Sequence, residues 1–329
     1  MLILPLRLNI AREGQSGILV RDKGKHMITK AKRIVSIGEC MVEMAPTGTP
    51  DHFGASFAGD TFNTAWYLAE LQPSWDVDFV TCIGTDTMSD KMADFTQAAG
   101  IGTEHIGRLT THTMGLYMIH LEDGERSFAY WRGQAAAREM MRQDGLVAGA
   151  VAGANVVYLS GISIAILDDA GRAALRETLI TARESGATIA FDPNLRLRLW
   201  PDVATMCAAV MDFASVSDIV FPSHDEEALF FGDADIAATQ ARYQGAGCTT
   251  IIVKNGGGEI SYLAGDESGS FAPQMADKVR DTTAAGDSFN AGFLGTEGNV
   301  KDQIAAGCAL AGRVIQGAGA LVEGAVEKG

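Results

Sequence analysis

The chain has 329 residues, 47% of them hydrophobic and 20% charged, which is the balance of an ordinary soluble globular protein with a full core. A formal net charge of −15 excludes broad nucleic-acid binding, because a phosphate backbone requires a basic face. No uninterrupted apolar stretch is long enough to span a bilayer, so we expect no membrane partner. The five cysteines are scattered and form no CxxC pair, which argues against a disulfide framework or a structural zinc site.

The first predicted element begins after residue 32. Residues 1–32 open with a short hydrophobic run, MLILPLRLNI, but no convincing cleavage site of a secretion signal follows it. We therefore expect residues 1–32 to be a loose N-terminal extension, with Met27 as a candidate natural start.

The next part of the chain mixes two patterns. Apolar runs typical of buried strands alternate with segments of helical spacing, at 33–40, 61–72, 77–84 and 88–100. Asp60 or Thr61 is expected to cap the first of these helices. Short extended pieces in 41–58 and a hairpin pattern in 114–132 break the alternation, and we expect them to form a small separate sheet.

After residue 150 the alternation is regular. Strands are predicted at 155–161, 187–192, 218–223, 249–255 and 258–264. Helices are predicted at 168–186, 201–214, 285–297 and 300–318, and a further helical stretch follows the strand at 218–223 and runs up to residue 244. This pattern predicts an α/β fold with a central, mostly parallel sheet and helices on both faces, in one domain over 33–329. The small sheet, from about 41–57 and 113–132, would be a lid over a site at the carboxyl ends of the strands.

A run of small residues precedes an acidic one at the start of a predicted helix, in DTTAAGDSFNAGF (281–293). Neither common nucleotide motif, GxxxxGK[ST] or GxGxxG, is present in the chain, so an ATP-dependent enzyme would need another phosphate site. Ala284, Ala285 and Gly286 would let backbone N–H groups approach an oxyanion closely, and Asp287 could accept a proton from a sugar hydroxyl. The alternative is that Asp287 merely complements the helix dipole.

This segment resembles the C-terminal signature DTxGAGD of the ribokinase-like (PfkB-type) carbohydrate kinases, and AGDTFN (58–63) resembles their N-terminal sugar-binding motif GGDxxN. Ala284 replaces a glycine, which is tolerable if its dihedral angles are helical. The resemblance covers about 33–320. It implies the ribokinase-like three-layer fold with a small β lid, and ATP- and magnesium-dependent phosphoryl transfer. Asp287 would be the base, and the N–H groups of Ala285, Gly286 and Asp287 would form the anion hole.

Within the family, IGECMVEM (37–44), the hairpin 115–132 and DPNLRLRLW (192–200) resemble the members that phosphorylate 2-keto-3-deoxygluconate, a sugar acid. By this resemblance the substrate would be bound by Gly59, Asp60, Asn63, Tyr117, Tyr130, Arg132 and Arg196. Arginine suits a carboxylated sugar because its fork binds a carboxylate with two hydrogen bonds. Packing within the hairpin is an equal alternative for the two tyrosines, and a solvated surface position is the alternative for Arg132.

Two further segments resemble the nucleotide side of the family's site. Ser223 and Glu226 lie where the family has NxxE, with serine in place of the asparagine, and Asn255 and Gly257 lie in a glycine-rich turn, KNGGGE. The alternatives are an acidic helix start for the first segment and an ordinary hairpin turn for the second. We expect no dedicated protein cage for a metal, and magnesium would be held through phosphates and water.

The sequence therefore predicts a cytoplasmic sugar-acid kinase that is specific for 2-keto-3-deoxygluconate, uses ATP and Mg²⁺, and forms a homo-oligomer. Two alternatives stay open. One is a kinase of the same family for a neutral sugar such as fructose or ribose, against which Arg132 and Arg196 argue. The other is an inactive kinase fold that serves as a sugar sensor, against which the intact Asp287 argues.

Overall fold

The computed structural model describes residues 32–49, 51–122 and 125–327. The chain divides into two units, 1–30 and 31–329, and every element below belongs to the second unit. The predicted N-terminal extension lies outside the described residues, except for Lys32. None of the described helices is both long and apolar enough to cross a membrane.

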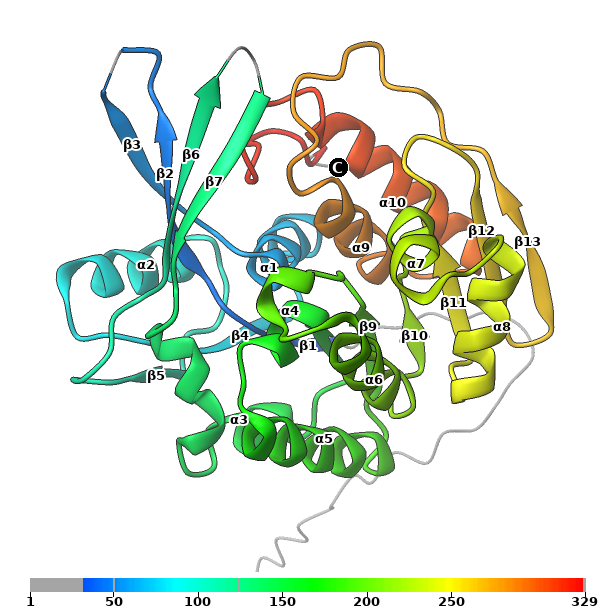
Figure 1. Cartoon of the computed structure of the whole chain (residues 1–329), viewed down its shortest axis with the longest axis horizontal. Helices are drawn as coiled ribbons and strands as arrows, with labels where there is room; N and C mark the ends of the chain where they lie inside the picture. The colour runs from blue at the N-terminus through cyan, green and yellow to red at the C-terminus, as the bar shows by residue number, and fades with distance from the viewer. Residues whose placement is uncertain (1–31, 50, 123–124, 328–329) are drawn as a thin grey trace, which may run out of the picture. The chain divides into compact units, whose positions relative to one another are not determined.

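A nine-stranded sheet forms the centre of this unit (Figure 1). The strand order is β13-β12-β11-β10-β9-β8-β1-β4-β5, and all neighbouring pairs are parallel except β11–β12 and β12–β13. The predicted α/β class with a mostly parallel central sheet is thus confirmed. The strands are β1 (Arg33–Ile37), β4 (Asp76–Ile83), β5 (Ile106–Arg108), β8 (Val156–Ser160), β9 (Thr188–Asp192), β10 (Ile219–Val220), β11 (Thr250–Val253), β12 (Ile260–Ala264) and β13 (Glu267–Phe271).

Helices cover both faces of this sheet because its strands are apolar on both sides. In β1, Ile34 belongs to one hydrophobic core, whereas Val35 and Ile37 belong to the other. One core packs against η1 (Ala136–Arg142), α3 (Leu146–Val151), α4 (Gly161–Ala165), α5 (Asp169–Glu184), α6 (Val203–Ala214), α7 (His224–Phe231) and α8 (Ile236–Ala246). The other packs against α1 (Asp60–Leu71), α2 (Thr87–Ala98), α9 (Ala285–Leu294) and α10 (Val300–Val314).

A second sheet of four strands has the order β3-β2-β6-β7 (Figure 1). Its strands are β2 (Met41–Pro46), β3 (Phe53–Ala58), β6 (Leu116–Glu122) and β7 (Glu125–Trp131). The predicted hairpin is confirmed, because β6 and β7 pair antiparallel with Leu116 opposite Trp131. One face of this sheet contributes Met41, Ala58 and Tyr117 to a small core that also contains Ala320 from the end of the chain.

The helices differ from the prediction in two places. Neither Asp60 nor Thr61 caps α1: the N-cap is Gly59, which has no side chain to accept from the helix N–H groups, and its own N–H donates to Oδ1 of Asn63 at 3.3 Å. Asp60 is instead the first helical residue, and its carboxylate is left to make contacts across the pocket described below. The predicted helical stretch up to residue 244 is two helices, α7 and α8, separated by a left-handed Gly232.

Candidate active site

A cavity of about 730 Å³ lies between the two sheets, at the carboxyl ends of the parallel strands. Its walls come from the loop after β9, the residues that follow β10 and β11, the starts of α1 and α9, and the second sheet. This is the edge at which open α/β sheets bind ligands, because the loops that follow the strands meet there. Nearly all the sequence-predicted site residues line this cavity: Gly59, Asp60, Asn63, Tyr117, Tyr130, Arg132, Arg196, Ser223, Glu226, Ala284, Ala285, Gly286 and Asp287.

Asp287 is half-buried, in the first turn of α9. The Nδ2 group of Asn63 donates to its Oδ2 at 2.8 Å, so a residue 224 positions earlier fixes the carboxylate. Burial raises the pKa of Asp287 to about 8, and the nearby charge of Asp60 adds to this shift. The hydrogen bond from Asn63 and the charge of Lys254 act in the opposite direction. The carboxyl group thus titrates near neutral pH, as suits a general base.

The start of α9 offers backbone donors to an anion. Ala284 has φ 58° and ψ 16°, so the right-handed helical dihedral angles that would make an alanine tolerable here are not present. The left-handed conformation turns the chain sharply into the helix, and a residue with a Cβ atom pays for it in strain. Ala285 donates its N–H to the carbonyl of Thr282 at 3.2 Å. In the described part of the chain, the N–H groups of Gly286 and Asp287 donate to no backbone carbonyl, which leaves two of the three predicted donors for a ligand.

The start of α1 contributes the sugar-side residues. A Cβ atom on Gly59 would overlap the carbonyl oxygen of Glu39, so only glycine fits where the helix start meets the β1–β2 connection. Asp60 accepts a 2.6 Å hydrogen bond from Nδ2 of Asn194, which has a positive φ of 36°. Sequence reasoning missed Asn194, although it lies inside the quoted DPNLR segment.

Two tyrosines of the second sheet form an aromatic wall of the cavity. The rings of Tyr117 and Tyr130 are stacked with centroids 5.7 Å apart, in directly opposed positions of β6 and β7. The hydroxyl of Tyr117 donates to the carboxylate of Glu43, and burial raises the pKa of Tyr117. Both rings also line the cavity, so their packing on each other does not prevent contact with a ligand, and the ligand contact stays a prediction.

The two predicted arginines already have acidic partners. Arg132 forms an ion pair with Glu39, and the side chains of the two are only 8% and 1% exposed, which overturns the alternative of a solvated surface cation. Burial raises the pKa of Glu39, and the neighbouring Arg132 opposes this shift. Arg196 pairs with Glu226, whose other oxygen accepts the N–H of Leu195 at 3.1 Å.

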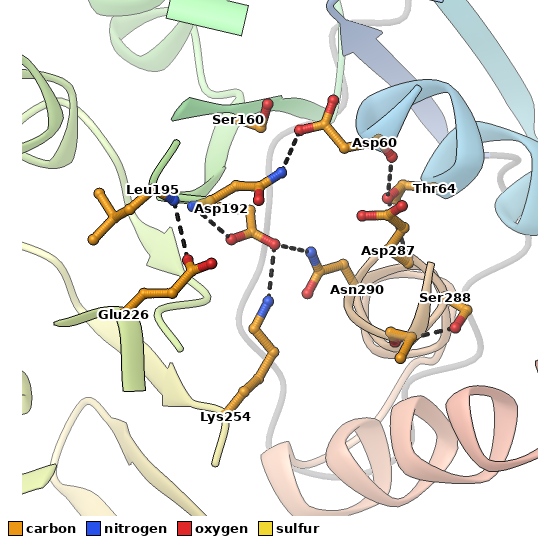
Figure 2. Close-up of polar contacts among 12 residues, drawn as sticks. Asp60, Thr64, Ser160, Asp192, Leu195, Glu226, Lys254, Asp287, Ser288 and Asn290 are labelled. Carbon is orange, nitrogen blue, oxygen red and sulfur yellow. Dashed lines mark hydrogen bonds and ion pairs between the residues drawn. The ribbon is translucent and has the colours of Figure 1, made fainter. Parts of the chain in front are cut away.

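The structure adds a polar cluster that the sequence analysis did not single out (Figure 2). Lys254, at the end of β11, forms a 2.8 Å ion pair with Oδ2 of Asp192, at the end of β9. Asn290 of α9 donates to the same oxygen at 2.7 Å. A charged residue at the carboxyl end of each of two buried strands was the signal that could have identified the pair.

A second cavity of about 360 Å³ opens on the other side of the α9 start. Its lining is largely apolar and comes from α9, α10 and residues 273–279. Ser223, Lys254 and Gly286 line both cavities and so mark the junction between them. Gly257 lines the second cavity, as expected of a nucleotide-side residue, whereas Asn255 lines neither.

Comparisons with known proteins agree with this geometry. The model of the pfkB family carbohydrate kinases matches residues 31–323. The chain is 37% identical to a 2-dehydro-3-deoxygluconokinase of Dickeya dadantii (strain 3937) over 88% of this chain and 97% of that protein. It is also 37% identical to the 2-dehydro-3-deoxygluconokinase of Haemophilus influenzae over 89% of this chain and 96% of that protein. Among solved structures, fructokinase with bound ATP from Xylella fastidiosa superposes with a TM-score of 0.75 at 25% identity, covering 88% of this chain and 94% of that one.

Proposed function

The chain belongs to the pfkB family of carbohydrate kinases and has their ribokinase-like fold, and from this we propose that it transfers the γ-phosphoryl group of ATP to the terminal hydroxyl of 2-keto-3-deoxygluconate (2-dehydro-3-deoxygluconate). The observation that carries this proposal is similarity to 2-dehydro-3-deoxygluconokinases over nearly the whole of both chains. A carboxylate beside free helix N–H groups in the cavity supports the reaction type.

Asp287 is the proposed base. Its carboxylate accepts the proton of the substrate hydroxyl as the hydroxyl oxygen attacks the γ-phosphorus and ADP leaves. Asn63 holds the carboxylate in place, since its hydrogen bond occupies Oδ2 and leaves Oδ1 for the substrate. The carboxyl group of Asp287 must be deprotonated before the attack. Activity therefore requires the ionised form of this group, although its pKa is raised.

The N–H groups of Gly286 and Asp287 are proposed to bind oxygens of the transferring phosphoryl group. Lys254 supplies the positive charge at this point, because it lines both cavities and its ammonium group lies 3.5 Å from where a Cβ atom of Gly286 would be. The second cavity, with Gly257 at its wall, is proposed to hold the remainder of ATP, and its apolar lining suits the adenine ring.

Magnesium is the ion that the family implies. The described residues include no group of three or more His, Cys, Asp or Glu side chains that could hold a metal. Ser223, which lines both cavities, and Glu226 and Asp192, which line the first, offer oxygen ligands, and these hard ligands fit an ion that takes most of its coordination from phosphates and water. When bound, Mg²⁺ neutralises phosphate charge. Ser223 and Glu226 would hold it through water.

We further propose that the four-stranded sheet is a lid, that residues 1–32 are a separate extension, and that the enzyme is a cytoplasmic homo-oligomer. A lid that closes over the substrate would exclude water and limit wasteful hydrolysis of ATP. Closure would bring Tyr117 and Tyr130 into contact with the sugar, because both belong to the sheet and line the cavity. Light scattering of the purified protein measures the oligomeric state.

The test of the proposed function is coupled detection of ADP with a substrate panel. The panel contains 2-keto-3-deoxygluconate, its galactonate epimer, fructose and ribose, each with ATP and Mg²⁺. We expect turnover of the sugar acid at micromolar to millimolar concentrations and little turnover of the neutral sugars. Preferred turnover of fructose or ribose would refute the substrate, and no turnover of any sugar would support the sensor alternative.

A further inference from the structure

Asn290 is a fully buried residue of α9, one helical turn after the proposed base Asp287. It lines neither of the two cavities described above. Its Nδ2 group donates to Oδ2 of Asp192 at 2.7 Å and to the hydroxyl of Tyr158 at 2.9 Å (Figure 2 shows the first of these bonds). Both hydrogens of the amide group are thereby used, and the side chain is fixed in one orientation.

The other half of this amide group is unpaired. Among the described residues, Oδ1 of Asn290 accepts no hydrogen bond. Rotation of the amide group does not relieve this, because Oδ1 would then face the carboxylate of Asp192, which accepts and does not donate. A buried acceptor without a partner costs free energy, and a leucine of similar size would avoid that cost. Stability of the core therefore does not explain the asparagine, whereas its two donors do something specific.

The more important of these donors meets Asp192, which also holds Lys254. Oδ2 of Asp192 accepts from the ammonium group of Lys254 at 2.8 Å as well as from Asn290, and Oδ1 accepts from the N–H of Asn194 at 3.2 Å. Because Lys254 and Asn290 share one oxygen, each offsets part of the negative charge that attracts the other. The amide group of Asn290 thus weakens the hold of Asp192 on Lys254.

We propose that Asn290 is a positioning residue for phosphoryl transfer, which holds Asp192 so that Lys254 can turn its charge from Asp192 to the transferring phosphoryl group. The inference rests on the proposed function and adds a residue that acts through Lys254. The ammonium group of Lys254 already lies beside the start of α9, 3.5 Å from where a Cβ atom of Gly286 would be. When it turns to a phosphate, Oδ2 of Asp192 keeps the hydrogen bond from Asn290.

Without Asn290, the same movement would leave Oδ2 of a nearly buried carboxylate with no donor among the described residues. An uncompensated buried charge is costly, so Lys254 would stay on Asp192 and contribute less to the transition state. The first experiment therefore compares wild type with Asn290→Leu and with the smaller Asn290→Ala, which cannot overpack the core. The control is Asn299→Leu, which removes the exposed cap of α10 and lies outside both cavities.

For both Asn290 variants we expect kcat to fall roughly tenfold, as for the loss of one weak hydrogen bond to a charged group. KM for 2-keto-3-deoxygluconate should change little, and the melting temperature should fall no more than in Asn299→Leu, whose kcat should match wild type. An unchanged kcat in both Asn290 variants, or an equal loss of kcat in the control, would overturn the inference.

A double-mutant cycle tests whether Asn290 acts through Lys254. In the background of Lys254→Met, the further change Asn290→Leu should have almost no effect on kcat, because the residue that it positions is already gone. A merely structural role would give the same loss with and without Lys254. A full additional loss of roughly tenfold in the double mutant would therefore overturn the inference.

Calorimetric titrations with Mg²⁺ and either ATP or ADP, without sugar, separate this inference from the proposed function. Asn290→Leu should weaken the binding of ATP and leave that of ADP nearly unchanged, because ADP lacks the phosphate that Lys254 meets. If this ATP-specific loss is found but wild type phosphorylates no sugar, the role of Asn290 stands and the kinase assignment fails. If wild type phosphorylates the sugar acid but the variant loses ATP and ADP equally, or neither, the role of Asn290 is wrong and the function stands. An absence of ATP binding to wild type would overturn both.

Discussion

Replacing Asp287 by asparagine should nearly abolish catalysis and stabilise the fold at the same time. The amide has nearly the same shape and can still accept the hydrogen bond from Asn63, but it cannot take a proton. Loss of a general base typically lowers kcat by about 10²–10⁴-fold. ATP binding should persist, because the backbone donors of Gly286 and residue 287 remain.

The stability gain follows from the pKa. The folded pKa of Asp287 is about 8, far above the usual aspartate value, so the folded state binds the proton more tightly than the unfolded chain. Stability from this group is complete at pH below the unfolded pKa of about 4 and is lost as pH rises towards the folded value. Each pKa unit corresponds to about 1.4 kcal/mol, and water in the cavity reduces the full effect, so we expect a gain of roughly 2 kcal/mol at pH 8.

The assay is thermal melting of wild type and Asp287→Asn at pH 5 and pH 8, without ligands. The mutant should melt several degrees higher at pH 8, and the difference should shrink at pH 5. Asp144→Asn, at an exposed position before α3, is the control and should show no such difference. If Asp287→Asn melts at or below the wild-type temperature at pH 8, the carboxylate is not held in an unfavourable environment and the reasoning is refuted.

Three further predictions concern the backbone and the charge around this group. Ala284→Gly should raise the melting temperature slightly, because relief of about 1–2 kcal/mol of left-handed strain exceeds the roughly 0.4–1 kcal/mol by which glycine favours the unfolded chain; a clear drop would contradict the strained turn. Lys254→Met should lower kcat by about 10²-fold or more with little change in KM for the sugar, while Lys254→Arg keeps part of the activity; an unchanged kcat would exclude Lys254 from phosphoryl transfer. Gly59→Ala should cost about 1–3 kcal/mol of stability and most of the activity, since the added methyl group meets the carbonyl of Glu39, and normal melting and turnover would show that the helix start can shift.

The elements of the fold were predictable where apolar periodicity is strong. The buried parallel strands and the long helices followed from apolar runs and 3.6-residue spacing. The start of α1 was not predictable, because Asp60 resembles a cap residue but its carboxylate accepts a hydrogen bond from Asn194, 134 residues away. The left-handed Ala284 was also unpredictable, since its strain is imposed by the turn into α9 and not by its own preference.

The site residues were identified by motif, but their partners were not. A motif places Arg132 and Arg196 at the cavity, yet nothing in their local sequence shows that Glu39 and Glu226 already neutralise them. Those pairs depend on contacts between distant segments. The motif selected Arg196 and passed over Arg198, which also lines the cavity and contacts Tyr130 of the other sheet.

The central claim is that Asp287 acts as the base of a kinase for a sugar acid. The most direct measurement is ADP formation by wild type and Asp287→Asn with 2-keto-3-deoxygluconate and with fructose, from pH 5.5 to pH 9. We predict turnover of the acid by wild type and nearly none by the mutant, with a wild-type rate that falls as pH drops below the raised pKa of Asp287. Comparable turnover by the mutant, or a preference of wild type for fructose, would contradict it.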